Sequence, residues 1–112
     1  MCCLWSVVPD QYDNIRVYRH DDVMLPCHVT PNTATNITWL QIPRKPSRQP
    51  LYNIYANGRI LQENVRHRFS INNASVGDYS LKISHIQESD AGQYQCFDQQ
   101  QLLQKYVIYV SG

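Results

Sequence analysis

Apolar residues recur at every second position in a series of short segments, and this alternation constrains the fold more than any other feature of the chain. Val23, Leu25, Cys27 and Val29 follow it in one segment, and Ile37 and Trp39 follow it in the next. Period two is typical of a β-strand with one buried face. The other predicted strands are residues 15–18, 51–55, 68–71, 79–83, 92–97 and 106–110.

Turn signals such as Asn57-Gly58 separate these segments, and no long helical pattern competes with them. About eight or nine short strands at regular spacing predict an all-β sandwich of two sheets. The chain has 112 residues, the size of one domain. Hydrophobic residues make up 43% and charged residues 17%, which is a globular composition.

Charge and hydropathy exclude several classes of partner. The net charge is +1, so the chain lacks the basic character expected of a protein that binds nucleic acid or an anionic membrane. No apolar run reaches the roughly 18 residues that a membrane-spanning helix needs. Membrane attachment would therefore come from segments outside this sequence.

The four cysteines are Cys2, Cys3, Cys27 and Cys96, and their number alone does not distinguish a reducing from an oxidising compartment. Residues 1–9 are interpreted as a leader remnant or an N-terminal extension, and residues 10–112 as the domain. Cys2 and Cys3 would be leader residues, free thiols or an intermolecular link.

The segment Asp90-Ala91-Gly92-Gln93-Tyr94-Gln95-Cys96 has every fixed position of the Asp-x-Gly-x-Tyr-x-Cys signature. Together with Cys27 and Trp39, it resembles the core of the immunoglobulin superfamily, from about residue 15 to residue 110. The resemblance implies a Greek-key, antiparallel two-sheet sandwich of the variable (V-set) type. It also implies a Cys27–Cys96 disulfide packed on Trp39, a Tyr94 hydroxyl bonded to upstream backbone, and an Arg68–Asp90 ion pair.

The start of the last predicted strand departs from the pattern of one group within this family. Rearranged antigen receptors carry Phe-Gly-x-Gly at the start of the last strand, whereas residues 101–106 read Gln-Leu-Leu-Gln-Lys-Tyr. The chain is therefore more similar to a germline-encoded cell-surface receptor of the immune type. Localisation at the extracellular side of the plasma membrane, or secretion, is expected.

The alternation of side chains in the predicted strands also indicates a ligand face. Trp39 and Cys96 point inwards, so their strand neighbours point outwards. A predicted F–G loop over residues 98–103 borders these positions. The candidate ligand face is Leu40, Phe97, Val107 and Tyr109, with Gln95, Asp98 and Leu102. Apolar patches of this kind often mark interfaces. The alternative is that neighbouring loops cover these side chains, or that they are ordinary scattered surface residues.

Two glycosylation acceptors support the secretory route, Asn36-Ile37-Thr38 and Asn73-Ala74-Ser75. Both are predicted at the end of the sandwich that antibodies use for antigen. Glycans there would shield the tip and leave the flat face for recognition.

The chemistry of an enzyme is missing from the pattern. The four histidines are dispersed, and neither a His-x-x-x-His nor a Cys-x-x-Cys spacing occurs, so no metal and no cofactor is expected. Two functions remain. The first is a receptor domain that binds a protein, or else a glycan or lipid, through the face formed by strands G (residues 106–110), F (92–97), C (around Trp39) and C′ (51–55). The alternative is a homophilic adhesion or co-receptor domain that forms a homodimer through the same face.

Overall fold

The computed structural model describes residues 12–31, 35–44 and 52–112. Its strands are β1 (Asp13–Tyr18), β2 (Val23–Leu25), β3 (Ile37–Pro43), β4 (Tyr52–Ala56), β5 (Arg59–Ile60), β6 (Phe69–Asn73), β7 (Asp78–Ile83), β8 (Gly92–Asp98) and β9 (Gln101–Ser111). Single turns of 3-10 helix occur at η1 (Glu63–Val65), η2 (Ala74–Val76) and η3 (Glu88–Asp90). Within these ranges, no helix has the length and apolar character needed to cross a membrane. Residues 1–9, with Cys2 and Cys3, lie outside the described part.

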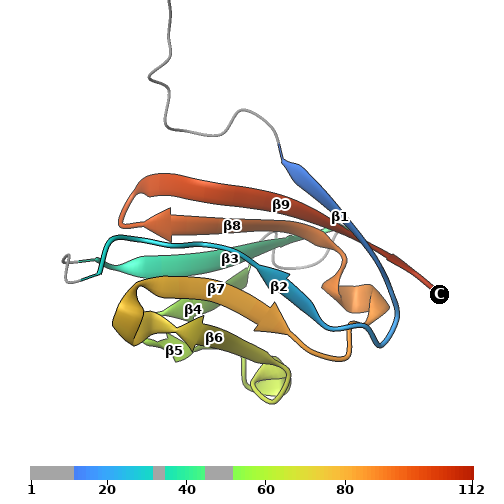
Figure 1. The fold of residues 1–112 in the computed structure, drawn as a ribbon. Coiled ribbons are helices and arrows are strands. Elements are labelled where there is room, and N and C mark those ends of the chain that lie inside the picture. Colours follow the sequence, from blue (N-terminus) through green and yellow to red (C-terminus); the bar gives the residue numbers. More distant parts are fainter. Residues whose placement is uncertain (1–11, 32–34, 45–51) are drawn as a thin grey trace, which may run out of the picture.

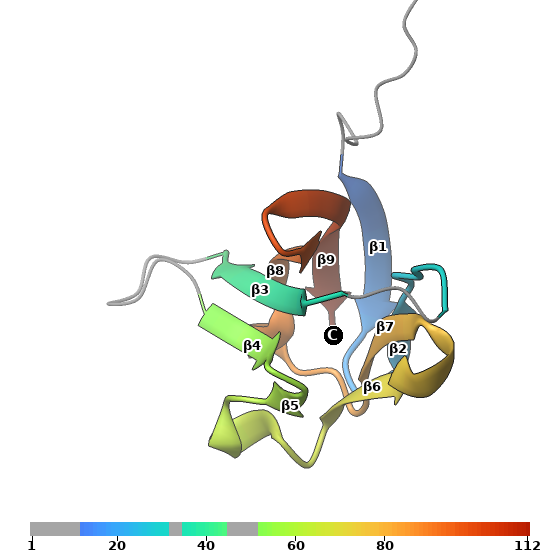
Figure 2. The ribbon, with the colours of Figure 1, turned by 90° about the vertical axis from the view of Figure 1, so that its left-hand side faces the viewer.

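The strands form two sheets that pack face to face, which confirms the predicted all-β sandwich (Figure 1). The larger sheet has the order β1-β9-β8-β3-β4-β5, and the smaller has the order β2-β7-β6. Seen along the strands, β2, β6 and β7 gather on one side and β3, β4 and β8 on the other (Figure 2). The pairings β3–β8 and β2–β7 join strands that are far apart in sequence, as Greek-key connections do.

One pair departs from the predicted antiparallel arrangement. β1 runs parallel to β9, in register from Asp13 opposite Tyr106 to Tyr18 opposite Ser111. The direction of β1 follows from the next connection, because the chain leaves β1 and crosses to β2 in the other sheet. No hairpin links β1 to β9, so nothing forces the two strands to be antiparallel.

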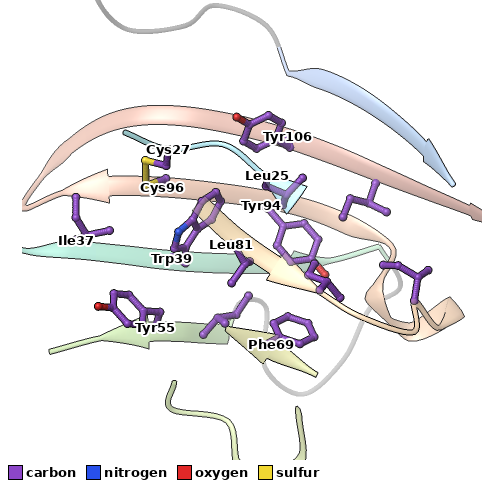
Figure 3. Close-up of a cluster of buried hydrophobic side chains, with 14 residues drawn as sticks. Leu25, Cys27, Ile37, Trp39, Tyr55, Phe69, Leu81, Tyr94, Cys96 and Tyr106 are labelled. Carbon is purple, nitrogen blue, oxygen red and sulfur yellow. A yellow bond between two sulfur atoms is a disulfide. The ribbon is translucent and has the colours of Figure 1, made fainter. Parts of the chain in front are cut away.

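The centre of the core is a disulfide between Cys27 and Cys96, which joins the two sheets (Figure 3). Trp39 packs beside it and is fully buried. Its indole nitrogen donates a hydrogen bond to the carbonyl of Tyr79 at 2.8 Å, so the polar end of the ring is satisfied inside the sandwich. The Trp39 and Tyr106 rings stack with their centroids 6.3 Å apart.

The end of the sandwich around η3 is held by buried polar contacts. Tyr94 is fully buried, and its hydroxyl donates to the carbonyl of Asp90. The burial also raises the pKa of Tyr94 well above its ordinary value. Arg68 and Asp90 form a buried ion pair with contacts of 2.8 and 3.1 Å, and this hydrogen bonding raises the pKa of the Arg68 guanidinium.

Gly92, in the same signature, adopts a φ of 145°. A Cβ atom on this residue would lie 2.5 Å from the carbonyl oxygen of Ile42. The fixed glycine of the motif is therefore required by the close approach of β8 to the end of β3.

Candidate ligand-binding face

The register of the larger sheet determines which side chains point away from the core. Trp39 pairs with Cys96 and Tyr94 pairs with Tyr106, and all four are buried between the sheets. The residues that alternate with them point outwards. Their cross-strand rows form the surface called here the outward face: Thr38–Phe97–Leu102, Leu40–Gln95–Lys105, Ile42–Gln93–Val107 and Tyr109–Arg16.

The apolar side chains of the outward face are half-buried. This holds for Leu40, Phe97, Val107 and Tyr109 alike. In the described ranges, the exposed large apolar side chains are those of Tyr18, Met24 and Val76, which lie outside these rows. The face is thus a flat surface whose side chains shield one another, rather than a set of protruding apolar groups.

Tyr12, just before β1, lies across the middle of the outward face. Its hydroxyl donates to Gln93 Oε1 at 2.8 Å and accepts from Gln95 Nε2 at 2.6 Å. Lys105 Nζ lies 4.8 Å from the centroid of the Tyr12 ring. Gln93 and Gln95 therefore form a bridged polar column on β8, between the apolar residues of β3 and those of β9. Sequence analysis missed Tyr12, because a residue ahead of the first predicted strand carries no signal of what it crosses.

The predicted F–G loop over residues 98–103 is wrong in its length. β8 continues to Asp98 and β9 begins at Gln101, so a turn of residues 99–100 joins them. Gln99 takes a φ of 56° in this turn. The register shifts between Cys96 and Phe97. As a result, Leu102 lies opposite Phe97 on the outward face while Leu103 packs against the core.

Asp98 lies at the end of the outward face that is next to the β8–β9 turn. Its carboxylate accepts a hydrogen bond from the backbone N–H of Asn36 at 3.1 Å. The carbonyl of Asn36 accepts another from the N–H of Gln99 at 2.9 Å. Asp98 therefore stabilises the junction between β3 and the β8–β9 turn, in addition to bordering the face.

Both predicted acceptor asparagines are exposed. Asn36 directly precedes β3, beside the β8–β9 turn. Asn73 ends β6, and its side-chain oxygen accepts a hydrogen bond from Ser75 Oγ at 2.7 Å. A contact of 3.4 Å between Thr35 Oγ1 and the Tyr79 hydroxyl links the approach to β3 with the start of β7, so both asparagines lie at one end of the sandwich. Their glycosylation stays a prediction.

A cavity of about 760 Å³ opens between the sheets near η3. Its lining includes Gln41, Tyr52, Phe69 and Asp90. Its buried carboxylate, Asp90, is already paired with Arg68. Over the described ranges, no group of three or more His, Cys, Asp or Glu side chains is arranged to hold a metal ion.

Comparison with known proteins gives a family match over most of the chain. The profile of the Immunoglobulin V-set domain matches residues 11–106. No curated protein sequence matches the chain.

Solved structures share the fold at low sequence identity. The RIG-5 IG1 homodimer is 16% identical with a TM-score of 0.72, and the match covers 92% of this chain and 94% of that one. Dpr1 IG1 bound to DIP-eta IG1 is 20% identical with a TM-score of 0.71, covering 92% of each chain. Murine CRIg is 18% identical with a TM-score of 0.68, covering 89% of this chain and 93% of that one.

Proposed function

This chain belongs to the immunoglobulin V-set family, and we propose that it is the extracellular ligand-recognition domain of an immune-type cell-surface receptor. A V-set domain is a binding module and not an enzyme, and its disulfide-bonded form is typical of extracellular proteins. The proposed ligand is a protein, bound by the outward face around Phe97 and Tyr109. The absence of Phe-Gly-x-Gly at the start of β9 supports a germline-encoded receptor over a rearranged one.

The observation that carries this proposal is the composition of the outward face. The rows on β3, β8 and β9 combine half-buried apolar groups with the paired amides of Gln93 and Gln95. Such a surface has the mixed character of a protein interface, and a rigid sheet presents it with little entropy to lose on binding. Glycans at Asn36 and Asn73 would leave this flat face accessible while shielding the end of the sandwich.

The test uses fluorescent tetramers of the domain on an array of extracellular proteins, glycans and lipid vesicles. We expect binding to a protein that is lost in Phe97→Ser and in Tyr109→Ser. Met24→Ser is the matched control, because Met24 is an exposed apolar side chain on β2 in the other sheet. Equal binding by wild type and Phe97→Ser, with both proteins folded, would refute the assignment of the face.

A homophilic adhesion domain is the second candidate. It is supported by the structural likeness to RIG-5 IG1, which forms a homodimer in its own crystal structure. Sedimentation equilibrium at rising concentration separates the two functions. A monomer up to about millimolar concentration excludes strong homophilic pairing, whereas a micromolar dimer broken by Phe97→Ser would favour it.

A further inference from the structure

Two arginines flank Tyr109 on the outward face. Arg16 Cζ lies 4.8 Å from the centroid of the Tyr109 ring, and Arg44 Cζ lies 5.8 Å from it. Arg16 comes from β1, on one side of β9, and Arg44 follows β3, which lies beyond β8 on the other side. Three segments that are distant in sequence therefore bring two guanidinium groups to one aromatic ring.

Stacking on a ring leaves the guanidinium N–H groups available to a ligand. The ring attracts the cation through its π-face, while the donors point outwards in the plane of the guanidinium. This arrangement also restricts the long arginine side chain before a ligand arrives. Both arginines are exposed, so each can offer paired N–H groups to a carboxylate.

Lys105 adds a third cation to the same face, in the row of Leu40 and Gln95. Its ammonium lies over the Tyr12 ring. The ion pairs found in the described part of the chain are Arg68–Asp90, Arg66–Glu63 and His28–Asp78, and none of them involves a cation of the outward face.

Two exposed carboxylates lie near these cations: Asp13 on β1, opposite Tyr106, and Glu88, which lines the cavity together with Arg44. Neither is among the ion pairs of the described part. Asp21 accepts the backbone N–H of Tyr18 and Asp22 that of His85, and Asp90 is buried. Asp98 is bonded at the end of the face next to the β8–β9 turn. The rows between Asp98 and Tyr109 contribute only neutral side chains and Lys105. The part of the outward face that carries Arg16, Arg44 and Lys105 is therefore cationic, although the whole chain is nearly neutral.

We propose that the partner of the outward face is a protein surface that presents Asp or Glu side chains, with one carboxylate held between Arg16 and Arg44 at Tyr109. This inference rests on the proposed function and names the chemistry of its ligand. A second copy of the chain fits poorly, because two such faces would bring like charges together, whereas an acidic surface would be attracted to them.

Charge reversal tests the proposal. In the tetramer array, Arg16→Glu combined with Arg44→Glu should weaken binding to the captured protein at least about tenfold. Lys82→Glu is the control, since Lys82 is exposed on β7 in the other sheet and its reversal changes the net charge in the same direction. We expect its binding to stay within about twofold of wild type. Raising NaCl from about 0.05 to 0.5 M should weaken wild-type binding, because salt screens exposed charges.

The outcomes separate this inference from the proposed function. A protein ligand lost in Phe97→Ser but retained by the Arg16→Glu and Arg44→Glu double variant would overturn the acidic partner and leave the face intact. A ligand indifferent to Phe97→Ser would overturn the proposed function itself. If phosphatidylserine vesicles capture the domain and no protein does, the ligand is an anionic lipid and the proposed acidic protein is wrong. Wild-type self-association that strengthens with salt would replace it with a second copy.

Discussion

Replacing Arg68 by methionine should strongly destabilise the domain. Arg68 Nη1 donates to Asp90 at 2.8 Å and to the carbonyls of Ser84 and His85 at 3.3 Å, and Nη2 donates to Asp90 at 3.1 Å. Both side chains of the ion pair are almost fully buried, at 6% and 4% exposure. Methionine fills similar space but leaves the Asp90 carboxylate buried with the Gln87 N–H as its other partner.

Breaking a buried ion pair by removing one partner costs about 3–5 kcal/mol. A domain of this size has roughly 5–15 kcal/mol of stability in total, so the loss is large and measurable. We expect Arg68→Met to lower the free energy of unfolding by that amount in urea titrations followed by tryptophan fluorescence. Adding Asp90→Asn should recover part of it, because an amide is far less costly to bury than an unpaired carboxylate.

The control is a second arginine, Arg66, whose ion pair is exposed to solvent instead of buried. Arg66 lies 3.5 Å from Glu63, and their side chains are 56% and 84% exposed. Arg66→Met should change the free energy of unfolding by less than about 0.5 kcal/mol. Equal effects of Arg68→Met and Arg66→Met would refute the argument from burial. If Arg68→Met fails to fold, Arg68→Lys provides the comparison, since it keeps the charge and loses the paired geometry.

Three further predictions concern the core. Reducing the Cys27–Cys96 disulfide, which closes a separation of 69 residues, should lower stability by about 4 kcal/mol in urea titrations with and without reductant; an unchanged midpoint would contradict this. Gly92→Ala should cost roughly 1–3 kcal/mol in thermal unfolding, because alanine strains a φ of 145° and its Cβ meets the carbonyl of Ile42; an equally stable variant would be evidence against that close approach. Burial, and secondarily Asp13, raises the pKa of Tyr106 to about 12, so the stability from its neutral phenol is present below pH 10 and is lost as the pH rises towards 12. Tyr106→Phe should flatten that loss in alkaline unfolding curves and remove a late-ionising tyrosinate from the absorbance titration, whereas loss of absorbance near pH 10 would show that Tyr106 ionises normally.

The sandwich could be predicted from the sequence because its evidence is local. Alternation in β3, β7 and β8 reports one buried face per strand, and the spacing of Cys27, Trp39 and Cys96 identifies the family. The sequence did not reveal the parallel pairing of β1 with β9, because the direction of a strand depends on where the chain goes next. It also did not reveal the extension of β9 to Gln101, since a register shift at Leu103 breaks the alternation there.

The candidate site could be predicted in part for a similar reason. Parity predicts that Phe97 points outwards because Cys96 points inwards, and the family pattern of the last strand predicts the same for Val107. Tyr12, Arg16 and Arg44 escaped notice because their roles come from contacts across strands. Arg44 directly follows β3, and only the order of strands in the sheet shows that it reaches Tyr109.

The parallel pairing of β1 and β9 has a mechanical consequence. β1 begins opposite the middle of β9, and the two strands run side by side to the end of β9, with aligned partners from Asp13–Tyr106 to Tyr18–Ser111. Tension applied between the start of β1 and the end of β9 pulls the two strands in opposite directions along their length. The backbone hydrogen bonds between them are then sheared together instead of being unzipped one at a time. A V-set domain pulled in this direction would resist unfolding more than one whose terminal strands are unzipped.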